Sequence, residues 1–227
     1  MTATATSATS APAAARRHNS PRRRLPRQER ARQLLDVAEA VFVERGVQSS
    51  SMDDIATAAG ITKPVLYDHF GSKDRLLAAV VLRSGTVLGE TVMAAVSAST
   101  TPEDALAHGL GAYFEFIEQR ISGLHTLLTE GVPPGSEAAA AMETVRDQQA
   151  ELIAGLLIAQ SATPDPTQAQ LYAQIVIGAT ERLATRPGNA ERPSVDVLTR
   201  HVMDVIWCGF ATLRDGERWE PNGGSGD

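Results

Sequence analysis

The residues with the clearest chemical potential in this 227-residue chain lie between positions 50 and 73. Lys63 can donate hydrogen bonds to guanine, and the neighbouring Pro64 and Val65 can pack on thymine methyl groups. Side chains that suit phosphate oxygens are Ser50, Ser51, Tyr67 and Lys73. These residue types, gathered in one short stretch, indicate contact with a nucleic acid.

Other kinds of chemistry find little support in the sequence. The histidines at positions 18, 69, 108, 125 and 201 form no pair at metal-ligand spacing with a nearby carboxylate. The stretch Gly223–Gly226 lacks the strand and helix that a nucleophile elbow requires, and no phosphate-binding glycine loop is present. We therefore expect no metal and no cofactor, and a helical enzyme is a remote alternative.

The charge is distributed unevenly along the chain. The net charge is −6, but residues 1–83 hold 13 Lys and Arg against 8 Asp and Glu, whereas residues 84–227 hold 8 against 19. The two parts are therefore +5 and −11. A basic N-terminal part on an acidic body is typical of a chain that presents one end to a polyanion.

Composition and apolar runs restrict the class of protein further. The chain is 43% hydrophobic and 21% charged, which is an ordinary globular composition. Its longest apolar runs, Leu76–Leu82 and Leu152–Ala159, fall short of the roughly 18 to 20 residues of a membrane span. The lone Cys208 excludes an internal disulfide framework. These features predict a cytoplasmic, nucleoid-associated protein that does not contact a membrane.

Hydrophobic periodicity and helix-capping signals predict an all-α protein with no sheet. Two Ser/Thr-x-x-Asp capping boxes, Ser51–Asp54 and Thr101–Asp104, open two of the predicted helices. The expected helices cover about 27–45, 52–59, 63–70, 73–97, 102–119, 136–160, 166–185 and 193–214, with a short segment at 122–130.

The stretch from Met52 to Phe70 has the spacing of a helix-turn-helix. Ala56 is small where the two helices would touch, Gly60 lies in the turn, and Leu66 is one of the aliphatic residues that hold the angle. The first turn of the second helix would then project, and a helix fits the major groove of B-DNA. The alternative is a three-helix satellite of a helical bundle, because helical hairpins with a glycine turn are common.

These elements suggest four segments. We expect a disordered Arg-rich arm at 1–26, a helix-turn-helix DNA-binding domain at 27–75, a helical regulatory and dimerisation domain at 76–218, and a flexible tail at 219–227. The long helix at 73–97 would join the two domains. The arm contains almost no apolar side chains that could enter a core, and it is equally consistent with a plain solvated tail.

The residues from Met52 to Leu76, MDDIATAAGITKPVLYDHFGSKDRL, resemble the N-terminal signature of the tetracycline-repressor (TetR) family of bacterial regulators. The resemblance covers about Arg27–Val81 and implies an all-helical homodimer, with recognition helices in successive major grooves and a ligand pocket in the C-terminal bundle. Asp68 departs from the aromatic or polar residue often seen at that position of the family, and Asp53 and Asp54 stand near the expected path of the phosphates. The family's DNA-contact pattern, to which we add Thr62, falls on Lys63, Pro64, Val65, Tyr67, His69 and Lys73.

A weaker likeness concerns the effector. The Arg24–Arg27 lead-in, Lys63–Tyr67 and Tyr113–Glu118 are similar to actinobacterial members that control fatty-acid synthesis and sense long-chain acyl-CoA. This likeness implies an effector that is acyl-CoA-like.

The last two predicted helices are apolar on more than one side, so each must be sandwiched. We expect one face of this pair to meet a second subunit, with a central helix of a monomeric bundle as the alternative. The residues predicted at the dimer interface are Ile175, Ala179, Val202, Ile206 and Phe210.

Polar and aromatic residues interrupt the apolar pattern of the C-terminal part and mark a candidate ligand pocket. Gln149 stands on an otherwise apolar helical stripe, and a buried amide needs partners. The other residues expected to line the same cavity are His108, Tyr113, Phe116 and His125.

Together these observations predict a ligand-responsive, sequence-specific transcriptional regulator, and repression is the expected direction. It would bind a palindromic operator in double-stranded DNA as a homodimer and be released by a small hydrophobic effector. A ligand-independent regulator and an architectural DNA-binding protein that uses the Arg-rich arm in the minor groove are the alternatives.

Overall fold

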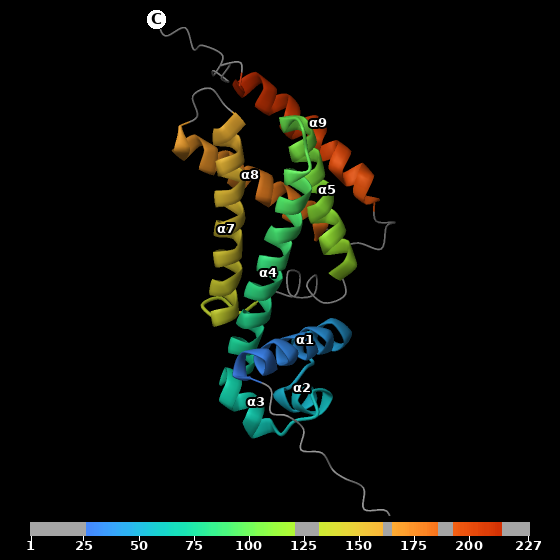
Figure 1. Cartoon of the computed structure of the whole chain (residues 1–227), viewed down its shortest axis with the longest axis vertical. Helices are drawn as coiled ribbons and strands as arrows, with labels where there is room; N and C mark the ends of the chain where they lie inside the picture. Colours follow the sequence, from blue (N-terminus) through green and yellow to red (C-terminus); the bar gives the residue numbers. More distant parts are fainter. Residues whose placement is uncertain (1–25, 121–131, 161–164, 186–192, 215–227) are drawn as a thin grey trace, which may run out of the picture.

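A computed structural model describes residues 26–120, 132–160, 165–185 and 193–214, which form eight helices and no strand (Figure 1). The all-α prediction is therefore confirmed. The predicted segments at 1–25, 122–130 and 219–227 lie outside the described residues. The helices are α1 (Arg27–Arg45), α2 (Met52–Ala58), α3 (Lys63–Phe70), α4 (Lys73–Ser97), α5 (Pro102–Arg120), α7 (Glu137–Gln160), α8 (Pro166–Ala184) and α9 (Val195–Arg214).

Helices α1 to α3 form a small head at one end of the molecule (Figure 1). Its core is completed by the first turns of α4, since Leu76 and Val80 are as deeply buried as Phe42 and Ile55. The same core includes Ala138 at the start of α7. The boundary expected at residue 75 thus falls inside α4, and the apolar packing of the head continues past it.

Helix α4 connects the head to the rest of the protein. Its 25 residues span about 37 Å at 1.5 Å per residue. It has a mean hydropathy of 1.5 over its most apolar stretch, and by length and composition it is the one helix in the described ranges that could cross a membrane. It packs against α1, α5 and α7 and buries seven of its 25 residues.

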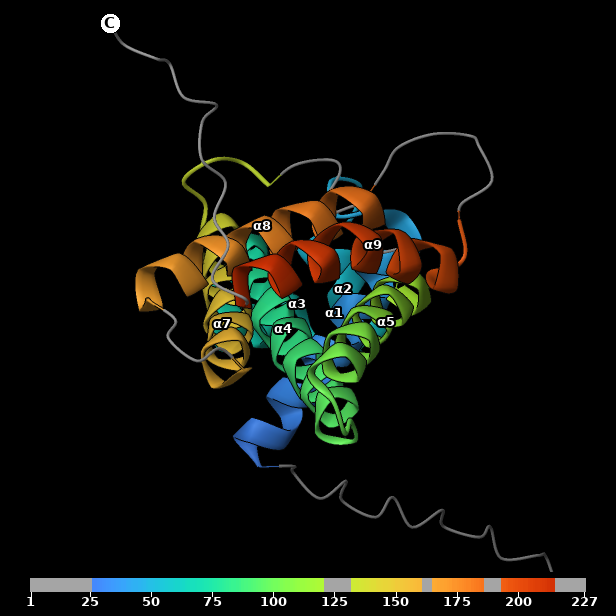
Figure 2. The same cartoon turned by 90° about the horizontal axis from the view of Figure 1, so that it is seen from above.

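Helices α5, α7, α8 and α9 surround the distal part of α4. Seen along the long axis, α8 and α9 lie side by side on one face, with α7 and α5 on either side of α4 (Figure 2). Alanines line the contact between α7 and α8, where Ala150, Ala154, Ala169 and Ala173 are almost fully buried. Such small side chains let α7 and α8 approach each other closely on this side of the bundle.

Candidate DNA-binding surface and ligand pocket

The turn between α2 and α3 is built by hydrogen bonds that the sequence pattern predicts. Ser51 caps α2, because its hydroxyl accepts from the Asp54 amide at 3.2 Å while the Asp54 carboxylate accepts from the Ser51 amide at 2.9 Å. Gly60 follows α2 with φ +63°, a conformation that L side chains rarely adopt. The Ile61 amide then donates to Ala56 O at 3.0 Å, which ends α2 and directs the chain into α3.

Helix α3 presents its first turn to solvent. Val65 is 42% exposed and Tyr67 is 41% exposed, whereas Leu66 between them is fully buried. Thr62, Lys63 and Pro64 are exposed as well, and His69 is half-buried. Burial of Leu66 fixes the rotation of α3, and the predicted base-reading side chains therefore point away from the head.

The ammonium group of Lys63 has two partners on this surface. It binds the Asp53 carboxylate at 2.8 Å and lies 5.9 Å from the centroid of the Tyr67 ring. The hydrogen bond from Lys63 and the charge of Asp53 raise the pKa of Lys63, so this side chain is a permanent cation. Lys63 is oriented by these two contacts before any ligand is present.

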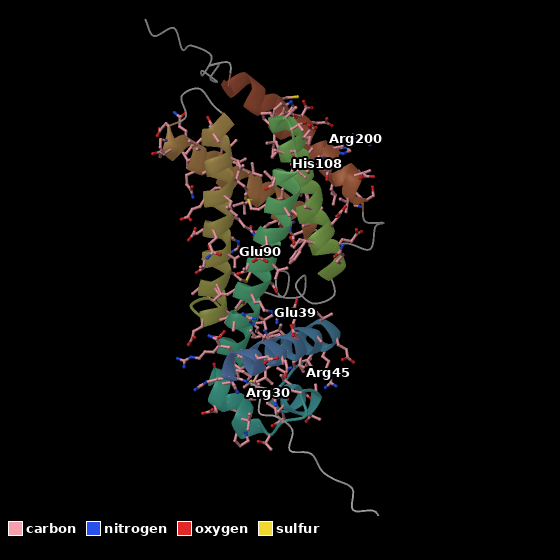
Figure 3. All side chains as sticks on the ribbon, viewed as in Figure 1. Arg30, Glu39, Arg45, Glu90, His108 and Arg200 are labelled. Carbon is pink, nitrogen blue, oxygen red and sulfur yellow. The ribbon has the colours of Figure 1, made fainter. Side chains whose placement is uncertain are left out.

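Two acidic residues of the head that lie near α3 are paired with basic side chains, whereas Asp68 is exposed on α3 itself. Asp53 binds Lys63, and Asp54 binds Arg45 at 2.9 Å. Hydrogen bonds from Ser51 lower the pKa of Asp54, and the charge of Arg45 lowers it further. Arg45 ends α1, where Figure 3 labels it together with Arg30. The sequence pattern alone did not identify Arg45, because its role depends on α1 ending beside α2.

Two of the predicted phosphate contacts differ from expectation. Ser50 is only 4% exposed, and its hydroxyl donates to Gly46 O at 2.6 Å. Its role is to close the loop after α1, and we withdraw it from the set of DNA contacts. Lys73 is half-buried; burial lowers its pKa, and Nζ lies 3.5 Å from Gln48 O. A third predicted phosphate contact, Ser51, is exposed, but its hydroxyl donates a hydrogen bond to the Asp54 carboxylate.

A clamp that the sequence pattern did not predict joins the head to α7. The Asp74 carboxylate accepts from the Glu137 amide at 2.8 Å and from the Ala138 amide at 3.2 Å, and it thereby caps α7 from the first turn of α4. The neighbouring Arg75 binds the Glu137 carboxylate at 2.8 Å. These residues are 62 to 64 positions apart in sequence, so no local pattern could reveal them.

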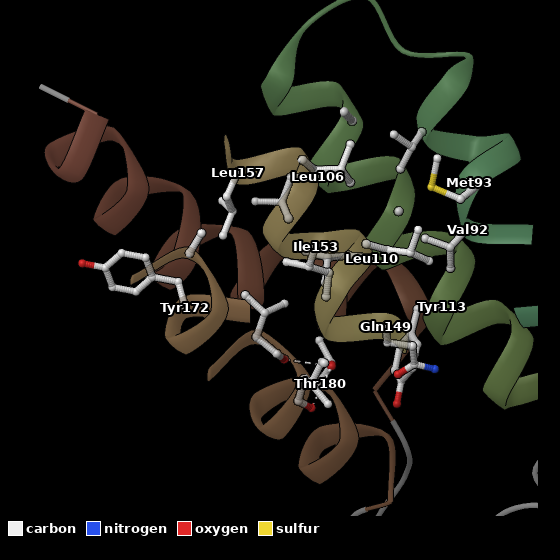
Figure 4. Close-up of a pocket in the computed structure, with 18 of the residues that line it drawn as sticks. Val92, Met93, Leu106, Leu110, Tyr113, Gln149, Ile153, Leu157, Tyr172 and Thr180 are labelled. Carbon is white, nitrogen blue, oxygen red and sulfur yellow. Dashed lines mark hydrogen bonds between the residues drawn. The ribbon is translucent and has the colours of Figure 1, made fainter. Parts of the chain in front are cut away.

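A cavity of about 200 Å³ lies between α4, α5, α7 and α8 (Figure 4). Its walls are mainly aliphatic, and two of the predicted ligand residues, Tyr113 and Gln149, line it. Phe116 is buried and lines a smaller neighbouring cavity of about 60 Å³, which shares Tyr113 and Gln149 with the larger one.

Of the two histidines predicted at the pocket, the structure describes only His108. His108 is exposed on α5 (Figure 3), and its Nδ1 lies 2.9 Å from the Ser99 hydroxyl. Helix α5 turns this ring toward the end of α4 and away from the cavity, so the prediction for His108 is wrong. His125 lies outside the described residues.

Polar groups gather at one end of the larger cavity, where Tyr113, Gln149 and Thr180 lie close together (Figure 4). Burial raises the pKa of Tyr113, and the negative charge of Glu181 raises it further. Glu181 in turn accepts from Arg146 Nε at 3.0 Å. Burial alone would lower the pKa of Arg146, but Glu181 and Glu143 outweigh that effect and raise it.

The predicted dimer residues divide between the surface and the core. Ile175 is 64% exposed and Ala179 is half-buried, but Val202 and Ile206 are 3% and 7% exposed. These two valine and isoleucine side chains pack inside the cluster formed with α5, so we remove them from the predicted interface. Among the described side chains of α9, the exposed large apolar ones are Val205, at 75%, and Val197, at 38%. The Phe210 side chain lies outside the described set.

Two family models match this chain, one over the head and one over the C-terminal helices. Residues 34–80 match the family model for bacterial regulatory proteins of the tetR family, and residues 102–209 match a tetracyclin repressor-like C-terminal domain. The chain is 31% identical over 189 residues to the transcriptional activator FasR of Mycolicibacterium smegmatis, which covers 83% of this chain and 86% of FasR.

Two solved structures are also similar to this chain. A TetR-like regulator from Rhodococcus sp. RHA1 has a TM-score of 0.62 and 32% identity, over 83% of this chain and 99% of that one. AibR in complex with isovaleryl coenzyme A and operator DNA has a TM-score of 0.59 and 20% identity, over 78% of this chain and 98% of that one. At that identity AibR supports the fold alone.

Proposed function

This chain belongs to the TetR family of bacterial transcriptional regulators, and from that premise we propose that it binds a palindromic operator as a homodimer and is released by a small hydrophobic effector. Its relatives are DNA-binding regulators and not enzymes. The proposed regulator acts on the nucleoid in the cytoplasm. The observation that carries the proposal is the exposed first turn of α3, in which Lys63 is charged and oriented.

The proposed contact set contains exposed residues of the head together with the half-buried His69 and Lys73. Lys63 reads a base edge once its ammonium exchanges Asp53 for a guanine acceptor, and Val65 packs on a thymine methyl group. Tyr67 and Lys73 bind phosphates on either side and set the register of α3. The complete proposed set is Ser51, Thr62, Lys63, Pro64, Val65, Tyr67, His69 and Lys73.

The apolar face of α8 supports the proposed homodimer. Leu171 and Ile175 are one helical turn apart and are 61% and 64% exposed, while Val205 on the adjacent α9 is 75% exposed. Ile175→Glu should therefore shift the protein to monomer in sedimentation equilibrium. Gln174→Glu adds the same charge at a neighbouring exposed position and should leave the dimer intact. If both variants remain dimeric, the interface lies elsewhere.

Ligand response is supported by the position of the cavity. It is lined by α4, whose first turns belong to the head, and by α7, which the clamp at Asp74 joins to the first turn of α4. A ligand that prefers one spacing of these helices would shift the position of the head. The solved complex of AibR with an acyl coenzyme A and operator DNA offers a precedent within the fold.

Repression is the proposed direction, and activation is a second candidate because FasR is named an activator. The central test is to select bound fragments from random DNA with the full-length protein. We expect inverted repeats whose half-sites lie about one helical turn, roughly 10 bp, apart. Enrichment of no sequence, with affinity that depends on salt alone, would favour the architectural alternative.

A further inference from the structure

The cavity has the size and lining of a site for one small apolar molecule. Its volume of about 200 Å³ exceeds the roughly 150 Å³ of an engineered cavity that holds benzene. By that comparison it admits about eight to ten non-hydrogen atoms. Aliphatic side chains such as Leu110, Ile153 and Leu157 form the walls (Figure 4), so the body of the ligand must be apolar.

The polar end of the cavity can bind one oxygen-bearing group. Thr180 is buried, and its hydroxyl is occupied by Val176 O at 2.9 Å and Ile177 O at 3.0 Å. Gln149 makes no hydrogen bond to another described residue and can offer both an N–H donor and a carbonyl acceptor. Tyr113 adds a phenolic hydroxyl beside it (Figure 4), and this hydroxyl is hydrogen-bonded to the Thr180 side chain. The two side chains together satisfy a hydroxyl, a ketone or an ester carbonyl.

The charges around this end oppose a carboxylate. Arg146 is the one cation among the described residues that line the smaller neighbouring cavity, but its guanidinium is bound to Glu181 at 3.0 and 3.2 Å and to Glu143 at 2.5 Å. These three side chains carry a net charge of −1. Burial raises the pKa of Tyr113, and the charge of Glu181 raises it further, in the same sense as the net negative charge of this cluster.

The walls of the cavity provide no compensating positive charge. Among the described residues that line it, the single charged side chain is Asp165, which caps α8 through the Thr167 amide at 3.0 Å. A carboxylate buried in this cavity would therefore find no cation to pair with among the described lining residues, one of which is already acidic. Burying an unpaired charge is costly, whereas burying a hydrogen-bonded neutral group is not.

We propose that this cavity selects a neutral, mainly aliphatic ligand whose oxygen-bearing group is bound by Tyr113 and Gln149, and that it rejects the corresponding free carboxylate. The proposal rests on the proposed function for its biological role, because it specifies the effector of the same site. The ligand class is a medium-chain alcohol, ketone or ester. An acyl thioester satisfies the same chemistry if its charged part stays outside the cavity.

Three probes of equal chain length test the selectivity. Isothermal titration of the full-length protein at pH 8 compares 1-octanol, 2-octanone and octanoate, and octanoate is fully ionised at that pH. We expect the two neutral probes to bind at least tenfold more tightly than octanoate. Octanoate binding as tightly as 1-octanol would overturn the proposal, and so would the absence of binding by both neutral probes.

Variants at the polar end provide the structural control. Tyr113→Phe and Gln149→Leu should each weaken 1-octanol binding by about tenfold, which is the loss expected when a hydrogen bond to the ligand is removed. Tyr172→Phe removes a hydroxyl that points away from the cavity (Figure 4) and should change 1-octanol affinity less than about twofold. Equal effects of Tyr113→Phe and Tyr172→Phe would contradict the assignment.

A variant that gains affinity for octanoate would show that charge, and not the shape of the cavity alone, causes the rejection of the carboxylate. Glu181→Gln removes one of the two carboxylates that bind Arg146 and makes the cluster neutral. We expect octanoate affinity to rise at least tenfold in Glu181→Gln, with 1-octanol affinity changed less than threefold. Unchanged rejection of octanoate in a folded Glu181→Gln protein would overturn the electrostatic basis.

Release from DNA is measured separately by fluorescence anisotropy on a selected operator. Neutral probes that bind the cavity but leave DNA affinity unchanged would refute the proposed ligand response and leave the selectivity supported. Probes that release DNA but show no preference for neutral groups would support the proposed ligand response and refute the selectivity. The two proposals can therefore fail independently.

Discussion

Gly85 is the position where α4 and α7 approach most closely among the glycines described, and replacing it tests how the bundle is packed. An ideal Cβ at Gly85 would lie 2.4 Å from Cγ2 and 2.8 Å from Cγ1 of Val145. Ordinary van der Waals contact begins at 3.4 Å, so Gly85→Ala requires a displacement of about 1 Å. Valine in a helix has one strongly preferred rotamer, about 90% occupied, and Val145 cannot turn aside cheaply.

Gly89 provides a matched control one turn further along the same helix. An ideal Cβ there would lie 3.9 Å from Leu152 Cδ1, which is an ordinary contact. Both substitutions gain up to about 1 kcal/mol of helix propensity, but only Gly85→Ala incurs an overpacking cost of about 1–3 kcal/mol. Gly89→Ala should therefore be more stable than wild type, and Gly85→Ala should be less stable than Gly89→Ala by about 1–3 kcal/mol.

Urea denaturation of the two variants measures this difference, and thermal melting should separate them by about 2–4 °C per kcal/mol. Val145→Ala in the Gly85→Ala background should recover most of the loss, because only the Val145 Cβ, at 3.2 Å, then remains close. A double-mutant cycle isolates that coupling. The reasoning is refuted if Gly85→Ala is as stable as Gly89→Ala, or if Val145→Ala gives no recovery.

The same displacement should reach the DNA-binding head. Gly85 lies 12 residues, about 18 Å, beyond Lys73 along α4, and the clamp at Asp74 ties that end of α4 to α7. Separating α4 from α7 at Gly85 should therefore lower operator affinity by at least about fivefold without any ligand. Operator affinity is measured by fluorescence anisotropy, with Gly89→Ala expected to match wild type.

The remaining predictions concern the head. Lys63→Ala should lower affinity about tenfold for operators with the preferred base and relax selection at that position, whereas Lys73→Ala should weaken all DNA sequences alike and reduce the salt slope by about 1. Asp53→Asn releases Lys63 and should raise affinity for non-specific DNA more than for the operator, so competition assays should show a lower specificity ratio. Asp54 has a pKa below 3.8 when folded, so its carboxylate stabilises folding fully above pH 3.8, and this contribution disappears as the pH falls through the folded value. Asp54→Asn should abolish that part of the acid-induced loss of stability, followed by circular dichroism, and Ser51→Ala should cost about 0.5–2 kcal/mol through loss of the cap.

Much of the fold could be predicted because the signals are local. Capping boxes, helix-start prolines and glycines at helix ends act within four or five residues, and the predicted helix bounds agree with the structure to within about two residues. The helix-turn-helix was predictable for the same reason, since Gly60 and the buried Leu66 set its geometry within one short stretch. The spacing thus indicated which side chains of α3 would be exposed.

The candidate sites depended on contacts between distant parts of the chain. The apolar stripes of α9 were visible in the sequence, but only packing on α5 shows that Val202 and Ile206 are internal and Val205 is external. The sequence suggested that the Ser50 hydroxyl lies on the surface, but in the structure this hydroxyl donates a hydrogen bond to Gly46 O. Likewise, Gln149 was a recognisable anomaly, while Arg146 and Glu181 became part of the pocket only through pairing across 35 residues.

By itself, then, the amino-acid order determined the helices, the DNA-binding turn and the separation of basic head from acidic body, because hydrogen bonds within a helix and its caps involve near neighbours. Tertiary structure alone decided which apolar faces are buried, how Asp74 joins the head to α7, and which charges surround the cavity. Those outcomes depend on the distances between helices, and the same apolar stripe can satisfy several packings that differ in what they leave exposed.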